Sequence, residues 1–167
     1  MDIGTTISGL VLTFICVLPI IIISRSSAKK KQFFIKAINQ LASQGNDTVT
    51  ATDIWGSAAI GIASDTNKVF FYTKSADYED ARTVNLNEMR ACRIVNISSA
   101  SGSKESQSRV IDRLELALVS RTPGMPETVL EFYNTERNKY TLTRELQLTD
   151  KWAGIINAAI KKTAPKK

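Results

Sequence analysis

A stretch without charged residues at the start of the chain constrains this sequence more than any other feature. Between Asp2 and Arg25 lie 22 uncharged residues, ending in Phe14-Ile15-Cys16-Val17-Leu18-Pro19-Ile20-Ile21-Ile22-Ile23. As a helix rising about 1.5 Å per residue, they would extend over about 33 Å. The hydrocarbon core of a bilayer is about 30 Å thick, so this length is sufficient to cross it. We therefore predict a transmembrane anchor over residues 1–24.

A cleaved signal peptide is the alternative interpretation of this stretch. Such a peptide needs basic residues before the apolar run and a cleavage site of small residues after it. Here Asp2 precedes the run, and four isoleucines followed by Ser24 and Arg25 end it. We therefore favour an anchor that stays on the protein.

The charges that flank the anchor predict its orientation. Arg25, Lys29, Lys30 and Lys31 follow the span closely, whereas no Lys or Arg precedes it. Basic residues beside a membrane span remain on the cytoplasmic side. The sequence thus predicts a single-pass protein with its N-terminus outside and residues 25–167 in the cytoplasm.

The net charge of +6 is unevenly distributed along the chain. Residues 25–46 contain five Lys or Arg and no acid, and residues 161–167 contain four Lys, whereas residues 47–160 contain 13 basic and 15 acidic residues. A nucleic-acid-binding domain would carry a basic face in its folded part. The distribution therefore argues against a nucleic-acid partner and indicates a membrane partner.

The segment 25–46 has the pattern of a basic amphipathic helix. Phe34, Ile38 and Leu41 recur at helical spacing, and Gly45-Asn46-Asp47 ends the pattern. One interpretation places this helix on the anionic inner leaflet, where its cations would contact headgroups. The other interpretation is that its apolar stripe packs against the following domain. The candidate membrane-surface residues are Arg25, Lys29, Lys30, Lys31 and Lys36.

Residues 47–162 have the pattern of a small β-rich domain closed by a helix, before a basic tail over residues 163–167. Trp152, Ile155, Ile156, Ala159 and Ile160 form one apolar stripe that predicts a helix from Thr149, its expected N-cap, to Lys162. A Ser/Gly-rich loop is expected between Ser98 and Ser108. Short apolar or alternating runs predict strands at Thr48–Ile54, Ala58–Ala63, Val69–Lys74, Arg82–Leu86, Ala91–Ile97, Val110–Val119, Thr128–Tyr133 and Lys139–Thr143.

This order predicts an α+β fold, a small antiparallel β-barrel or sheet closed by a C-terminal helix. The segment Trp152-Ala153-Gly154-Ile155-Ile156-Asn157-Ala158-Ala159-Ile160 resembles the Trp-containing helix that closes pleckstrin-homology-like barrels. The phosphoinositide-binding members of that superfamily resemble one another in basic residues around the first hairpin. Here the corresponding turn is Ser64-Asp65-Thr66-Asn67-Lys68, so the resemblance does not imply specific inositol-lipid binding.

The whole chain also resembles uncharacterised small single-pass bacterial membrane proteins with a cytoplasmic pleckstrin-homology-like domain. This resemblance implies the bacterial inner membrane as the location, but no reaction and no ligand. The residues that carry it are Asp53-Ile54-Trp55, Ala59-Ile60-Gly61-Ile62, Val69-Phe70-Phe71, Leu130-Glu131-Phe132-Tyr133-Asn134-Thr135-Glu136, Leu146-Gln147-Leu148 and Lys151-Trp152.

The composition excludes several classes of catalytic and metal site. There is no histidine, which removes the Ser-His-Asp triad, the Cys-His dyad and every histidine-containing zinc site. Two distant cysteines, Cys16 and Cys92, cannot form a tetrathiolate site. We expect no enzyme, no catalytic residue, no metal and no cofactor, and the sequence identifies no small-molecule ligand.

The sequence therefore predicts a membrane-tethered cytoplasmic binding or scaffold module, or an accessory subunit of an inner-membrane protein complex. Its expected partner is another membrane or cytoplasmic protein. Phe132 and Tyr133 are the candidate partner-binding residues, because neighbouring residues of a regular strand point to opposite faces and one of the two would be exposed. The alternatives are an anionic-lipid surface sensor and an unrecognised enzyme.

Overall fold

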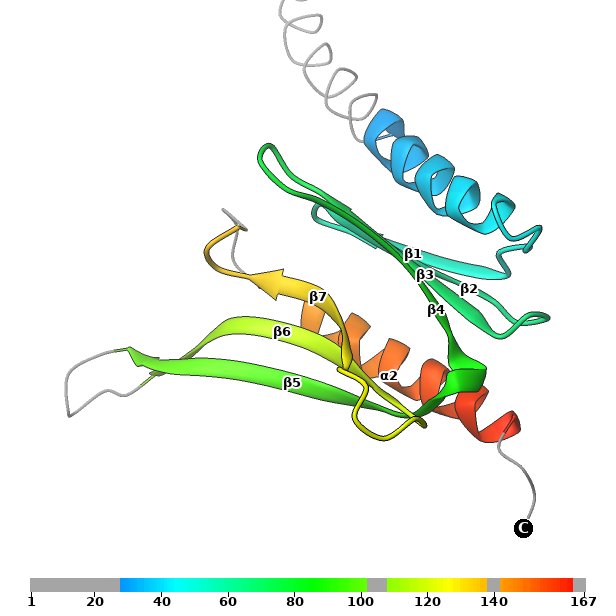
Figure 1. Ribbon diagram of the computed structural model, residues 1–167. Coiled ribbons are helices and arrows are strands. Elements are labelled where there is room, and N and C mark those ends of the chain that lie inside the picture. The colour runs from blue at the N-terminus through cyan, green and yellow to red at the C-terminus, as the bar shows by residue number, and fades with distance from the viewer. Residues whose placement is uncertain (1–27, 102–107, 138–141, 164–167) are drawn as a thin grey trace, which may run out of the picture.

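Two antiparallel sheets and two helices make up the part of the chain that the computed structural model describes, namely residues 28–101, 108–137 and 142–163 (Figure 1). The first sheet has the order β1-β2-β3-β4, and the second has the order β5-β6-β7. A short 3-10 helix, η1 (Leu86–Glu88), connects them. The strands are β1 (Ala51–Trp55), β2 (Ala58–Ala63), β3 (Lys68–Lys74), β4 (Glu79–Asn85), β5 (Met89–Ser101), β6 (Ser108–Ser120) and β7 (Thr128–Asn134), and the C-terminal helix is α2 (Glu145–Lys162). The predicted α+β class is confirmed.

The predicted hairpin between β2 and β3 is confirmed. Ala63 pairs with Lys68 across the turn, and Ile60 pairs with Phe71 further along the ladder. Asn67 takes the left-handed conformation, with a φ of 56°, that a tight polar turn requires at this position. The two apolar runs on either side of the polar turn thus pair as the hairpin that the sequence predicts.

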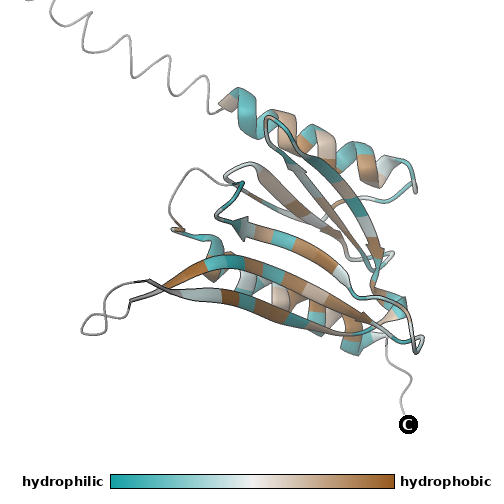
Figure 2. Cartoon of the chain, turned by 60° about the vertical axis from the view of Figure 1, so that its left-hand side comes forward, coloured by the Kyte–Doolittle hydropathy of each residue, from teal (hydrophilic) through white to brown (hydrophobic). Residues whose placement is uncertain are grey.

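The second sheet extends further than the sequence pattern indicates. The loop expected at Ser98–Ser108 is wrong at its beginning, because β5 continues to Ser101, while β6 begins at Ser108, where the loop was expected to end. A register shift between Ile97 and Ser98 lets the polar stretch stay paired, with Ser99 opposite Val110. Hydrophobic and hydrophilic residues alternate along these two strands in Figure 2.

The strand expected at Lys139–Thr143 receives no support from the described residues. Residues 138–141 lie outside them, while Leu142 and Thr143 have irregular and bent backbone. Leu142 is half-buried and packs against the main core. Leu142 therefore contributes to the packing of the main core and is not part of a strand.

Helix α2 begins one turn earlier than expected, so Thr149 is not its N-cap. Thr149 is fully buried within the helix, and its hydroxyl donates to the carbonyl oxygen of Glu145 at 2.7 Å. The buried carboxylate of Glu145 instead accepts from the backbone N–H groups of Thr143 at 2.7 Å and Arg144 at 2.9 Å. The first turn is therefore stabilised by a carboxylate that lies inside the helix.

The main core lies between the two sheets and α2. Trp152 is completely buried at its centre, together with Ile156 from the same helix and Phe71 and Leu116 from the two sheets. The ring of Trp55 stacks on Phe132 with centroids 4.4 Å apart. This core joins the two sheets into one body.

A second, smaller core lies on the other face of the first sheet. Residues 28–43 form a helix, here called the basic helix, that covers this face (Figure 1). Its Phe34, Ile38 and Ala42 are buried against Ala59 and Phe70 of the sheet. The apolar stripe of this helix therefore packs on the domain, which is the second of the two sequence interpretations.

Gly61 lets the basic helix approach the first sheet closely. A Cβ atom at Gly61 would lie 2.8 Å from Cγ2 of Ile38 and 3.1 Å from Cγ1 of Val49. The glycine in β2 is thus needed for space, because its φ angle is not in the left-handed region that favours glycine.

The basic helix ends where Gly45-Asn46-Asp47 predicts. Asn46 has a φ of 56°, and the Asp47 N–H donates to the carbonyl oxygen of Ala42 at 3.0 Å. Lys68 at the start of β3 donates to Oδ2 of Asp47 at 2.9 Å. The end of the helix is thus attached to the first sheet.

The predicted anchor over residues 1–24 lies outside the described residues. Among residues 28–163, apart from the two gaps, no helix combines the length and the hydropathy needed to cross a membrane.

We predict that Ile38→Ala destabilises the protein much more than Ile35→Ala. Ile38 is 0% exposed in the second core, so its truncation leaves a cavity and lowers the free energy of unfolding by about 2–5 kcal/mol. Ile35 on the same helix is 36% exposed, and its truncation should change stability by about 0.5 kcal/mol or less. Urea unfolding of the full chain in mild detergent measures both. Equal midpoints for the two variants would contradict the packing described here.

Candidate functional site

The predicted membrane-surface lysines lie on the exposed side of the basic helix. Lys29, Lys30, Lys31 and Lys36 are all exposed, while Arg25 lies outside the described residues. Burial of the apolar stripe and exposure of these lysines are compatible, because they occupy different sides of one helix. The helix therefore presents fixed cations while it is attached to the sheet.

A pocket beside the basic helix combines two of these lysines with Arg144, which the sequence analysis did not identify. It has a volume of about 430 Å³, and its wall includes Lys30, Lys31, Asp53, Trp55, Gly56 and Arg144. We call it the basic pocket. Residues from the first helix, from the end of β1 and from the segment before α2 meet there, so only the tertiary fold could reveal it.

Asp53 is the acidic residue in the wall of the basic pocket, and it is already paired. Its Oδ2 accepts from Nζ of Lys151 at 2.6 Å and from Nε1 of Trp152 at 2.9 Å. These bonds hold β1 against the first turns of α2. The ammonium group of Lys151, which does not line the pocket, also compensates the negative charge of Asp53.

Phe132 and Tyr133 are both buried, so the expectation that one of them is exposed is wrong. Their exposed fractions are 2% and 6%. The register explains this result: Leu114 pairs with Tyr133 and Glu115 pairs with Glu131, which leaves Phe132 as an extra residue in β7. A bulge of this kind interrupts the alternation of side chains, so two neighbours can both point inward. Neither aromatic ring offers a partner-binding surface.

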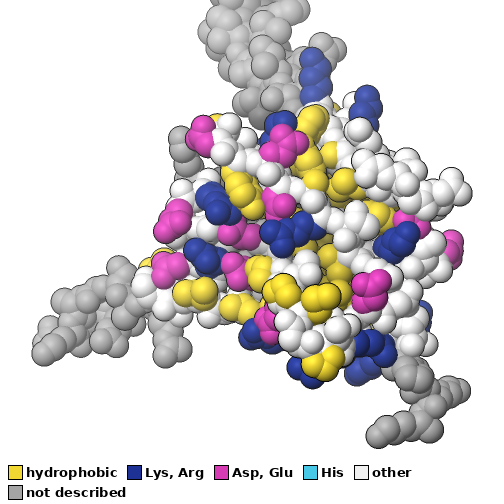
Figure 3. All heavy atoms as spheres, viewed as in Figure 1, with side chains coloured by type: hydrophobic (Ala, Val, Ile, Leu, Met, Phe, Trp, Pro, Cys, Tyr) yellow, Lys and Arg dark blue, Asp and Glu magenta, His cyan; other side chains and the backbone are white. Residues whose placement is uncertain are grey.

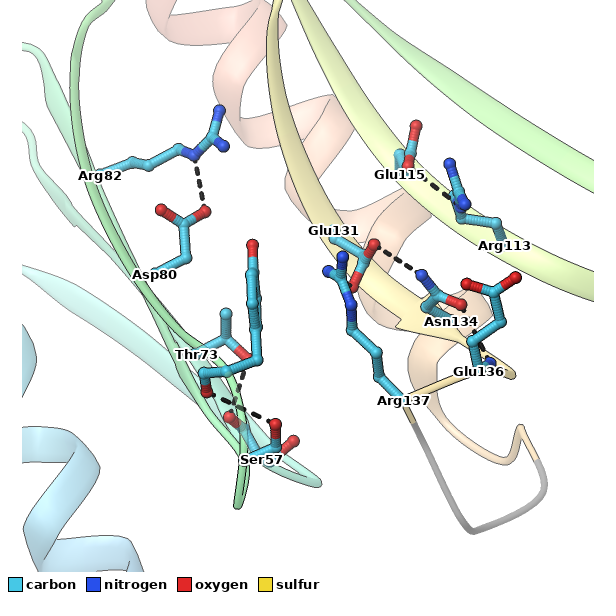
Figure 4. A network of polar contacts seen from close by, with 12 residues as sticks. Ser57, Thr73, Asp80, Arg82, Arg113, Glu115, Glu131, Asn134, Glu136 and Arg137 are labelled. Atoms are coloured by element: carbon cyan, nitrogen blue, oxygen red, sulfur yellow. Dashed lines mark hydrogen bonds and ion pairs between the residues drawn. The ribbon is translucent and has the colours of Figure 1, made fainter.

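A network of polar contacts surrounds the end of β7 (Figure 4). Glu131 accepts from Nη1 of Arg137 at 2.8 Å and from Nδ2 of Asn134 at 2.9 Å. The guanidinium of Arg137 lies over the ring of Tyr78 from the β3–β4 turn, 4.0 Å from its centroid. This contact connects the two sheets beside a cavity of about 550 Å³.

Glu115 is a partly buried carboxyl of this network whose pKa is shifted. Its side chain is 13% exposed, and it lies 3.7 Å from Nε of Arg113. Burial raises the pKa of the Glu115 carboxyl above its ordinary value, and the charge of Glu131 raises it further, while Arg113 and Arg137 act in the opposite direction. Two carboxylates and two guanidinium groups thus form a balanced cluster, which suits a structural role.

The acidic residues of β4 are also held by neighbouring groups. Glu79 accepts from Lys74 and from the hydroxyl of Tyr72, both at 2.6 Å, and Asp80 accepts from Arg82 at 2.7 Å. Within the described residues no group of acidic, cysteine or histidine side chains is arranged to hold a metal ion.

The outer edge of β5 is closed at one point and open beyond it. The side chain of Asn157 in α2 accepts from the Cys92 N–H at 2.9 Å and donates to the Cys92 carbonyl oxygen at 2.8 Å. It therefore replaces a neighbouring strand at this position. Further along β5, Ile94 and Ile97 are 39% and 47% exposed. An exposed strand edge with apolar side chains is a recurrent protein-binding feature.

On the face drawn in Figure 3, hydrophobic side chains lie among Lys, Arg, Asp and Glu of both signs. The basic pocket and the β5 edge differ from this mixed surface, the first in its charge and the second in its exposed isoleucines.

No family model matches the chain, and no curated protein and no solved structure is found to be similar to it.

We predict that Glu115→Gln raises stability at neutral pH. The folded-state pKa of Glu115 lies above its ordinary value of 4.5, so the folded state binds the proton more tightly than the unfolded state. The free energy of unfolding therefore falls as the pH rises through the window between these two pKa values, and it stays reduced above that window. Glu115→Gln should abolish this part of the pH dependence.

Urea unfolding between pH 4 and pH 8 measures this effect, with Glu127→Gln as the matched control. Glu127 forms an ion pair with Arg93 at the surface, so its loss should change stability by about 0.5 kcal/mol or less. A Glu115→Gln variant that is less stable than the wild type at pH 7 would show that the ion pair outweighs the burial of the carboxylate.

Proposed function

We propose that this chain is a membrane-tethered, cytoplasm-facing binding or scaffold module, or an accessory subunit of a bacterial inner-membrane protein complex. Its partner is another membrane or cytoplasmic protein. Anchoring raises the effective concentration of such a module near a membrane partner, so that a modest affinity suffices for binding.

The packing of the basic helix is the observation that carries this proposal. The predicted membrane span ends at residue 24, and the helix that packs on the first sheet is already formed at residue 28. Three residues of chain reach about 10 Å at most. An anchor at residues 1–24 would therefore hold the domain close to the bilayer, in an orientation limited by the packed helix instead of a long flexible linker.

We also propose that the domain has a pleckstrin-homology-like fold. Support comes from the order of the elements, a four-stranded antiparallel sheet followed by a three-stranded one and by a C-terminal helix. The buried Trp152 in that helix, between the two sheets, agrees with this assignment. Folds of this breadth serve many functions, so the proposed binding role depends on the surface of this chain and not on the fold.

The open part of the β5 edge is the surface we assign to the protein partner. Ile94 and Ile97 offer apolar contacts on the two faces of β5, and the outer side of this edge strand can accept an added strand. Because these contacts are apolar and backbone-mediated, partner binding should depend weakly on ionic strength, whereas attachment to anionic lipid would weaken steeply with salt.

We predict that a cysteine at position 125 is protected in intact bacterial cells. Met125 is 62% exposed in the β6–β7 turn, and Cys92 is buried, so a Met125→Cys thiol would be the reactive one in the domain. An impermeant maleimide should label it only after lysis, while an Asp2→Cys control, which precedes the uncharged span on the outer side, should react beforehand. Labelling of position 125 in intact cells would contradict the predicted orientation.

We predict that Ile97→Lys abolishes co-purification of the partner. The full-length chain would be isolated from membranes in mild detergent, and wild type compared with Ile97→Lys and with Met125→Lys. A partner bound at the β5 edge should be lost with the first variant and retained with the second, which places the same charge at another exposed apolar position. Retention by both variants, or loss from both, would contradict the assignment to this edge.

A further inference from the structure

The basic pocket brings together three cations from two distant segments of the chain. Lys30 and Lys31 belong to the basic helix, and Arg144 precedes α2. Among the described residues, no ion pair or side-chain hydrogen bond compensates any of these three side chains. Like charges placed around one pocket repel one another, so an anion between them would be stabilising.

The one carboxylate in the pocket wall does not supply this compensation. Asp53 lies in the wall, but its Oδ2 already accepts from Lys151 and Trp152. Lys151 is outside the wall, so the Asp53–Lys151 pair leaves the charges of Lys30, Lys31 and Arg144 uncompensated. The pocket therefore carries an excess of positive charge although residues 47–160 as a whole are slightly acidic.

The wall behind these cations is fixed by the fold. Trp55 is stacked on Phe132, and its Nε1 donates to the Phe132 carbonyl oxygen at 2.9 Å. The backbone N–H of Arg144 donates to the buried carboxylate of Glu145 at 2.9 Å, and its carbonyl accepts from Leu148 at 3.0 Å. The backbone positions of the cations are thus set before any ligand binds, which reduces the entropic cost of binding.

We propose that the basic pocket binds a phosphate group. The planar fork of Arg144 suits two phosphate oxygens at once, and Lys30 and Lys31 add two point charges from the basic helix. At about 430 Å³ the pocket has room for a phosphate and the small organic group attached to it. This site is independent of the proposed protein partner, which we assign to the β5 edge.

The phosphate can come from a membrane lipid or from a soluble compound. If residues 1–24 span the membrane, Lys30 follows the span by six residues, which corresponds to about 9 Å along a helix. A lipid headgroup is then within reach of the pocket. Free phosphate or a soluble phosphate ester would bind the same three cations, so the two sources are separated by experiment.

The test uses the full-length protein and its thermal unfolding midpoint, because a ligand that binds only the folded state raises this midpoint. In one arm, inorganic phosphate is titrated into the protein in neutral detergent at constant ionic strength. In the other arm, the protein is placed in nanodiscs of phosphatidylcholine with or without phosphatidylglycerol. Wild type is compared with Lys30→Gln/Lys31→Gln, with Arg144→Gln, with all three changes together, and with a control, Lys29→Gln/Lys36→Gln, that removes two charges from the same helix outside the pocket.

We expect a stabilisation of the wild type and of the control in at least one arm. Arg144→Gln and Lys30→Gln/Lys31→Gln should each weaken the response, raising the half-saturating phosphate concentration about tenfold or more if that arm responds. The variant with all three changes should raise the half-saturating phosphate concentration by less than the product of the two separate increases, because one ligand contacts both segments. A response to phosphate identifies a soluble ligand as sufficient, and a response only to phosphatidylglycerol identifies the lipid headgroup.

The proposal is overturned if neither probe stabilises the wild type, or if Arg144→Gln keeps the full response. It is also overturned if the control loses as much of the response as Lys30→Gln/Lys31→Gln does.

Discussion

The burial of β2 and β3 on both faces is the constraint on which the rest of this structure depends. One face of these strands carries Ile60 and Phe71 into the main core, and the other carries Ala59 and Phe70 into the second core under the basic helix. A sheet buried on both sides needs a covering element on each, and here α2 with the second sheet covers one side and the basic helix the other. The basic helix is therefore part of the folded domain. Removing it would expose Phe70 and Tyr72, so a fragment that begins after Gly45 lacks one side of its own core.

This double burial also explains how a surface site arises from residues that are far apart in the sequence. Gly61 allows the basic helix to lie close to β2, and that contact fixes where Lys30 and Lys31 stand relative to β1. Asp53 of β1 in turn holds Lys151 and Trp152, which positions the start of α2 and with it Arg144. The basic pocket lies where these two sets of contacts meet. Its shape follows from the packing of both cores and not from any local motif.

The sequence predicts those features that depend on local pattern. Alternation and turn residues predict β2, β3 and their hairpin closely, and helical spacing identifies both the stripe of the basic helix and the stripe of α2. The sequence-based prediction is wrong where a tertiary contact overrides the local sequence pattern. Glu145 stabilises the first turn of α2 from a buried position, which no capping pattern indicates, and the bulge at Phe132 turns two neighbouring aromatic residues to the same side. Arg144 could not be identified in advance, since it becomes notable only beside Lys30 and Lys31.

The two binding features of the surface differ in physical character, and this difference limits how they can act together. The β5 edge offers apolar side chains and backbone groups, while the basic pocket offers charge. Asn157 closes the β5 edge at Cys92 from α2, the same helix whose first residues follow Arg144. A phosphate bound at Arg144 would contact the start of α2, and a strand added along β5 would lie next to the point where Asn157 of the same helix meets β5. If both sites are occupied, the chain would hold a protein partner and a phosphate group on one folded domain, as the proposed scaffold function requires.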